Sequence, residues 1–70
     1  MEFDFSRLKG RIREKGFTQV DLAKAVGISS SSLNLKINNK RDFTLKETFA
    51  IAKILGIDDC NPFFYVEKLP

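Results

Sequence analysis

The side chains that could catalyse a reaction are few in this 70-residue chain, and they are not paired with one another. No histidine occurs, and the acidic pair Asp58 and Asp59 has no recognisable base beside it. Cys60, the single cysteine, can form neither an internal disulfide nor a zinc site, so we expect a buried or half-buried filler. A glycine-rich phosphate loop is also absent. The sequence therefore predicts a protein that is not an enzyme and has no metal or other cofactor.

A polar segment, residues 29–34, carries the side chains best suited to hydrogen bonding with a partner. It reads SSSSLN, and its hydroxyl and amide groups can both donate and accept, as the edges of DNA bases require. A solvated helix start would contain the same serines. The preceding segment, with Ala23 at its centre and Gly27 at its end, favours a helix-turn-helix over about residues 18–38. In that motif the second helix presents its first residues to the major groove.

Two helices are predicted before this segment. A first helix over about residues 5–15 is indicated by apolar side chains at helical spacing, namely Phe5, Leu8 and Ile12. A second helix over about residues 18–26 begins at Thr18, with Asp21 completing a variant of the capping box, and ends at Gly27. Its buried side is expected to be Val20 or Leu22, together with Ala23 and Val26.

Two further helices are predicted after the turn. The third covers about residues 30–38, with Ser29 as its N-cap and with Leu33 and Ile37 facing inward. A loop follows, and Phe43 after it is expected to plug the core. The fourth helix begins at the capping box formed by Thr44 and Glu47 and ends at Gly56. Its expected apolar stripe is Leu45, Thr48, Phe49, Ala52 and Leu55.

The C-terminal tail, about residues 58–70, permits two interpretations. Asn61 and Pro62 are typical of a helix start, whereas the aromatic residues after them favour a strand. The tail therefore forms either a short helix or a strand-like extension. The aromatic side chains either pack on the core or form a surface for self-association: Phe63, Phe64 and Tyr65. The expected fold is a single all-α domain, residues 1–70, with four to five short helices.

The run from Leu8 to Glu47, LKGRIREKGFTQVDLAKAVGISSSSLNLKINNKRDFTLKE, resembles the lambda-repressor-like (XRE or Cro-type) helix-turn-helix family. Within that family it is similar to small regulators from phages and prophages of Gram-positive bacteria. The resemblance extends from Phe5 to Ile57 and weakens in the tail. One departure is Asn39, where many relatives carry glycine, although asparagine also tolerates a left-handed backbone.

The resemblance implies roles for particular residues. The residues expected to contact bases are Ser30, Ser31, Asn34 and Leu35. The residues expected to contact phosphates are Gln19, Lys36, Asn38, Lys40 and Arg41. Gln19 is also expected to buttress the recognition helix. Leu35 lies about 200° around the helix from buried Leu33, so it should point outward and suit a thymine methyl.

Two groups of basic residues have an alternative interpretation. Lys40 and Arg41 could equally belong to a charged loop that binds nothing. The cations of the first helix are expected to lie behind the DNA-contacting helices: Arg7, Lys9, Arg11, Arg13 and Lys15. A net charge of +3 and a pI near 9.2 tolerate a polyanionic partner without requiring one.

The resemblance thus implies a Cro- or repressor-type transcriptional regulator that binds a double-stranded DNA operator, as a homodimer at least on DNA. We expect a cytoplasmic protein with no membrane association and no small-molecule ligand. The alternative is a protein-interaction module, antitoxin-like or adaptor, that uses the same fold and docks through its aromatic tail. The operator sequence, the sense of regulation and the dimer surface do not follow from the sequence.

Overall fold

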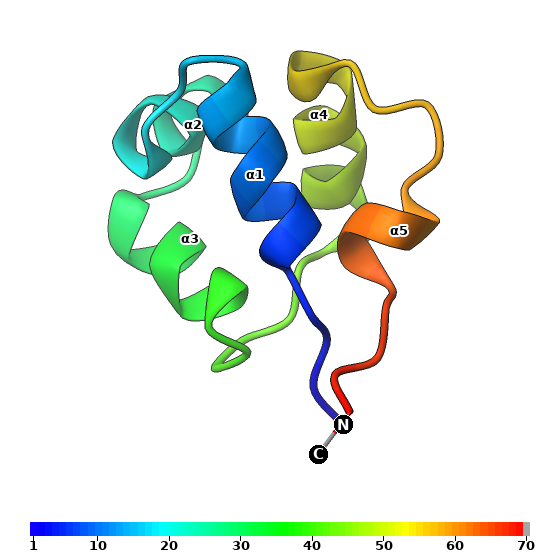
Figure 1. Cartoon of the computed structure of the whole chain (residues 1–70). Helices are drawn as coiled ribbons and strands as arrows, with labels where there is room; N and C mark the ends of the chain where they lie inside the picture. The colour runs from blue at the N-terminus through cyan, green and yellow to red at the C-terminus, as the bar shows by residue number, and fades with distance from the viewer. Residues whose placement is uncertain (70) are drawn as a thin grey trace.

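The computed structural model describes residues 1–69 and consists of five short helices joined by turns (Figure 1). The helices are α1 (Ser6–Glu14), α2 (Gln19–Val26), α3 (Ser30–Ile37), α4 (Leu45–Leu55) and α5 (Asn61–Phe64). This confirms the predicted all-α bundle, with every boundary of the first four helices close to its expected place. Pro70, the last residue of the predicted tail, lies outside the described residues. Within residues 1–69, every helix is too short or too polar to cross a bilayer.

Local hydrogen bonds fix the starts of α2 and α4, as the sequence predicts. Thr18 Oγ1 accepts from the Asp21 amide, and the Asp21 carboxylate accepts from the Thr18 amide. Thr44 and Glu47 repeat this arrangement at the start of α4. Both boxes satisfy amides that a helix N-terminus otherwise leaves unpaired. The hydrogen bond from the Thr18 amide also lowers the pKa of Asp21, so this carboxylate stays charged at the positive end of α2.

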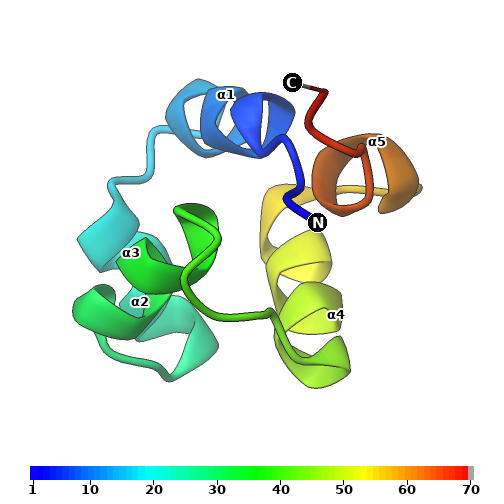
Figure 2. The same cartoon turned by 90° about the horizontal axis from the view of Figure 1, so that it is seen from below.

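The core forms where α2 packs on both α3 and α4 and where α1 packs on α5 (Figure 2). The largest fully buried side chains come from all five helices: Leu8, Leu22, Leu33, Ile51, Leu55 and Phe64. Phe43 lies between Phe5 and Phe64 in edge-to-face contacts with ring centroids 5.3 and 5.4 Å apart, which confirms its predicted role as a core plug.

The predicted apolar stripe of α4 was wrong at two positions. Leu45 is 79% exposed and Phe49 is 67% exposed, whereas Ile51, which the stripe omitted, is fully buried. The buried residues of α4 are Thr48, Ile51, Ala52 and Leu55, so three of the five predicted positions do face inward. In α2, Leu22 rather than Val20 is the buried residue.

The tail contains both of the structures that its sequence favours. Residues 61–64 form α5, and the chain then pairs antiparallel with the N-terminus through a bridge between Phe3 and Glu67. The Asp4 amide donates to the Val66 carbonyl at 2.7 Å, and the Lys68 amide donates to the Glu2 carbonyl at 2.8 Å. Within α5, Phe64 is buried against the core, so core packing is the correct interpretation for this aromatic residue.

Candidate nucleic-acid interface

A sharp turn joins α2 to α3. Gly27 adopts φ 89°, a left-handed conformation that L-residues with a Cβ resist. The Ala23 carbonyl accepts from the amides of both Gly27 and Ile28, at 2.9 and 3.0 Å, which closes the end of α2. Ser29 Oγ then accepts from the Ser32 amide and starts α3. Since Leu33 and Ile37 are buried beneath α3, the opposite side of this helix faces outward.

A shallow hollow lies on the outward side of α3. It is lined by Gln19, Val20, Ser30, Ser31, Asn34 and Leu35. All four residues predicted to contact bases therefore line one surface, together with Gln19 from α2. Val20 is the residue that the sequence reasoning missed here, because its apolar type left it as a candidate for the core. Its position beside Gln19 in the first turn of α2 was the available signal.

Three amide side chains connect α2 to the outward side of α3. Asn38 donates from Nδ2 to Oδ1 of Asn34 at 3.2 Å and also to the Asn34 carbonyl at 2.9 Å. Asn34 in turn donates from Nδ2 to Oε1 of Gln19 at 3.4 Å. The hydrogen bonds run in one direction, from Asn38 to Gln19. Gln19 therefore accepts through its oxygen and keeps its Nε2 hydrogens for another acceptor.

The position of Lys36 does not fit its predicted contact with phosphate. This residue is 8% exposed rather than solvated, and its Nζ contacts both carboxylate oxygens of Glu47, with 2.6 Å to Oε2. Burial alone would raise the pKa of Glu47, but hydrogen bonds from Lys36 and from the Thr44 amide lower it below its ordinary value. The ammonium group thus pairs with a residue of α4, and no local feature of the sequence indicates this pairing.

The other predicted phosphate contacts lie at the end of α3 and in the loop after it. Asn38, Lys40 and Arg41 are all exposed, and the Lys40 amide donates to the Leu35 carbonyl at 2.8 Å. Asn39 adopts φ 61°, a left-handed backbone conformation that asparagine tolerates better than most residues. Its side chain donates to the Phe3 carbonyl and accepts from the Phe3 amide, both at 2.9 Å. The loop is therefore fastened to the N-terminal segment.

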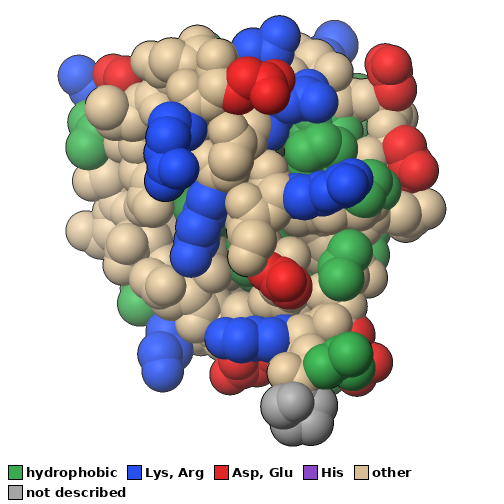
Figure 3. Space-filling view, in the orientation of Figure 1, with side chains coloured by type: hydrophobic (Ala, Val, Ile, Leu, Met, Phe, Trp, Pro, Cys, Tyr) green, Lys and Arg blue, Asp and Glu red, His purple; other side chains and the backbone are tan. Residues whose placement is uncertain are grey.

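Charge is distributed unevenly over the surface. On the face seen in Figure 3, Lys and Arg side chains lie over α1, α2 and α3, and others lie toward α4, α5 and the chain ends. Most Asp and Glu side chains on this face lie toward the segment after α4 and toward the chain ends. A polyanion would therefore be attracted to the side that also carries the outward face of α3. Within residues 1–69, there is no cluster of side chains suited to hold a metal ion.

One protein family matches this chain. The family model described as "Protein of unknown function (DUF739)" matches residues 1–67, which is nearly the whole sequence. No curated protein matches the chain.

Proposed function

The chain belongs to the family described as "Protein of unknown function (DUF739)", and we propose that it is a sequence-specific double-stranded DNA-binding protein, a transcriptional regulator of the lambda-repressor-like (XRE or Cro) type. The observation that carries the proposal is the hollow on α3, which exposed Ser30, Ser31 and Asn34 line together with half-buried Leu35 after the sharp turn at Gly27. A helix so presented, on the basic side of a small domain, has the form required to enter a major groove.

In the proposed complex, α3 lies in the major groove. The Ser30 and Ser31 hydroxyls and the Asn34 amide hydrogen-bond base edges, while Leu35 contacts a thymine methyl. The flanking phosphates are bound by Gln19, Asn38, Lys40 and Arg41. Two copies bind a palindromic operator, with the two α3 helices in successive major grooves. The protein then acts in the cytoplasm as a Cro- or repressor-type regulator.

A second candidate is a protein-interaction module on the same fold. The exposed Leu45 and Phe49 of α4 favour it, because an isolated domain gains nothing from placing these two side chains in water. The aromatic tail supports it less, since Phe64 is used in the core. Salt separates the two candidates: binding through phosphates weakens steeply as salt rises, whereas apolar docking does not.

The test is a selection of bound duplexes from a random pool, followed by mobility shifts with the selected duplex and with random DNA. We expect preference for one palindromic sequence and a steep loss of affinity with salt. Ser31→Ala and Asn34→Ala should change which bases are selected. Lys53→Ala, at an exposed position of α4, should not. Equal binding of selected and random duplexes at every salt concentration would rule out sequence-specific regulation.

A further inference from the structure

Two basic residues of α1 lie beside the α3 surface, although the sequence led us to expect them behind it. Lys9 and Arg13 are one turn apart and both are exposed. They line a hollow together with Ile12, Phe17 and Gln19. Gln19 is therefore shared between this hollow and the one on α3.

Lys9 also borders a second depression, at the other end of α3. This depression includes Ile37, Asn38 and Asn39, and Lys68 from the tail. Shared residues link the three hollows. Gln19 lines both the hollow on α3 and the hollow with Arg13, and Lys9 lines both the hollow with Arg13 and the depression at the end of α3. Residues of α1, α2 and α3 thus line three neighbouring hollows, from the start of α3 to its end.

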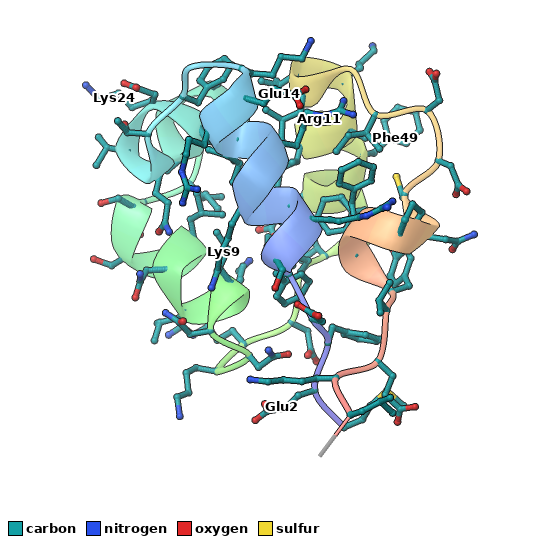
Figure 4. All side chains as sticks on the ribbon, viewed as in Figure 1. Glu2, Lys9, Arg11, Glu14, Lys24 and Phe49 are labelled. Carbon is teal, nitrogen blue, oxygen red and sulfur yellow. The ribbon has the colours of Figure 1, made fainter. Side chains whose placement is uncertain are left out.

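The opposite side of α1 is used differently. Arg11 donates to the Leu55 carbonyl at 3.1 Å, pairs with Glu14 and lies 5.1 Å from the centre of the Phe63 ring. Arg7 borders the same side, in a hollow with Arg11, Glu14 and Phe63. In Figure 4, Lys9 lies on the side of α1 toward α3, and Arg11 lies on the side toward α4. Helix periodicity thus divides the cations of α1 into two groups.

We propose that Lys9 and Arg13 bind backbone phosphates of the duplex next to the groove that α3 occupies. This inference rests on the proposed function. Within residues 1–69 neither residue forms an ion pair, so both cations are available to a phosphodiester. Arginine binds phosphate oxygens through a fork of donors, and lysine through a compact charge. The Gln19 amide lies between these two cations and the α3 hollow. Residues of α2 and α1 would therefore contact phosphates along the same DNA strand.

The two acidic residues that border the depression beside Lys9 make contacts of their own. Asp4 borders the depression that contains Lys9, but its carboxylate accepts from both the amide and the hydroxyl of Ser6. Glu2 borders the same depression and pairs with Lys68 at 3.8 Å. Both carboxylates therefore have partners of their own, and the phosphate contacts do not require an ion pair of Lys9 or Arg13 to break.

The test compares Lys9→Gln, Arg13→Gln and the double variant with Arg7→Gln as matched control. Arg7 is exposed on the same helix, two residues from Lys9, and its substitution also removes one positive charge. Fluorescence anisotropy of a labelled duplex is measured across a series of KCl concentrations. The slope of log K against log[KCl] should become shallower by about 0.9 for each lost phosphate contact. The double variant should lose about twice that, and Arg7→Gln should leave the slope unchanged.

The possible results separate the two claims. Equal slopes for Arg7→Gln and for the Lys9 and Arg13 variants would overturn the phosphate contacts while leaving DNA binding intact. A wild-type protein that binds no duplex would overturn the proposed function itself, and this inference with it. The order of preference among duplexes should be the same for all variants, because phosphate contacts carry no direct sequence information. Circular dichroism confirms that each exposed substitution leaves the helices intact.

Discussion

Asn34 of α3 donates a hydrogen bond from Nδ2 to Oε1 of Gln19 on α2, over 3.4 Å. This contact joins the two helices across their turn on the exposed side of the molecule. It also orients the Gln19 side chain, since the oxygen faces Asn34 and the Nε2 donors are left for a phosphate oxygen. Asn38 supports the arrangement by donating to Asn34 Oδ1. The three amides thus position the donor that the proposed DNA complex uses.

Gln19→Ala should weaken binding of every duplex by about the same factor. A hydrogen bond to a charged group contributes about 1.5–3 kcal/mol, which corresponds to a loss of roughly 10- to 150-fold in affinity. Gln19→Glu keeps an acceptor for Asn34 but replaces the donor by a negative charge, so it should weaken binding more. Anisotropy titrations with the selected duplex and two unrelated duplexes measure this. A loss confined to one duplex would assign Gln19 to base contact instead.

Lys36 and Glu47 should make the fold sensitive to acid. The pKa of Glu47 is lowered in the folded protein, so its ion pair stabilises the fold above its ordinary pKa of 4.5. That contribution is lost as the pH falls through the lowered value and the carboxylate takes up a proton. Glu47→Gln keeps an oxygen for the Thr44 amide and removes only the charge. Leaving Lys36 buried without its partner should cost about 3 kcal/mol at neutral pH.

Urea unfolding of wild type and Glu47→Gln at several pH values between 2 and about 7 provides the measurement. The difference in unfolding free energy between the two proteins should shrink as the pH falls. Asp4 and Asp21 also have lowered pKa values, so the variant keeps part of the acid dependence. A difference that stays constant with pH would show that the Glu47 charge does not stabilise this fold.

The helix starts could be predicted from the sequence because their causes are local. Thr18 with Asp21, and Thr44 with Glu47, lie three residues apart, and each pair forms its hydrogen bonds within one turn. Gly27 likewise stops α2 through its own backbone conformation. On the outward side of α3, Leu35 followed from local periodicity once Leu33 was taken as buried, whereas Ser30, Ser31 and Asn34 were implied by the family resemblance.

The features that could not be predicted depend on contacts between distant segments. Lys36 and Glu47 are eleven residues apart, and they meet only because α2 packs on both α3 and α4 and brings these two helices together. A lysine near a helix end is usually solvated, and the family resemblance implied a phosphate contact for Lys36. The direction in which α1 presents Lys9 also depends on how that helix packs on the others. Periodicity defines the sides of a helix but not which side meets a neighbour.

Phe64→Ala and Phe49→Ala should differ widely in their effect on stability. Phe64 is 2% exposed and contacts Phe43 edge to face, so its truncation should cost about 3–5 kcal/mol through lost burial and a cavity. Phe49 is mostly in water, and its truncation should change the unfolding free energy by less than about 0.5 kcal/mol. Thermal unfolding of the two variants at equal concentration measures both effects. A large loss for Phe49→Ala that shrinks on dilution would instead indicate that α4 is covered by a second copy.

Asn39 should stabilise the fold both through its backbone and through its side chain, and two substitutions separate these contributions. Asn39→Gly keeps the left-handed backbone at φ 61° but loses both hydrogen bonds to Phe3, at a cost of about 1–3 kcal/mol. Asn39→Ala loses the same bonds and adds a Cβ that disfavours this conformation, so it should be less stable than the glycine variant by about 1 kcal/mol.

Hydrogen exchange of the Phe3, Asp4 and Lys68 amides measures whether the terminal pairing depends on the Asn39 side chain. We expect these amides to lose protection in both variants. Asn39 forms hydrogen bonds with Phe3, whereas the tail forms hydrogen bonds with Glu2 and Asp4 on either side of it, so both sets position the same segment. Amides within α1 and α4 should keep their protection. Unchanged protection at Asp4 and Lys68 would mean that the tail holds the N-terminus without help from the loop after α3.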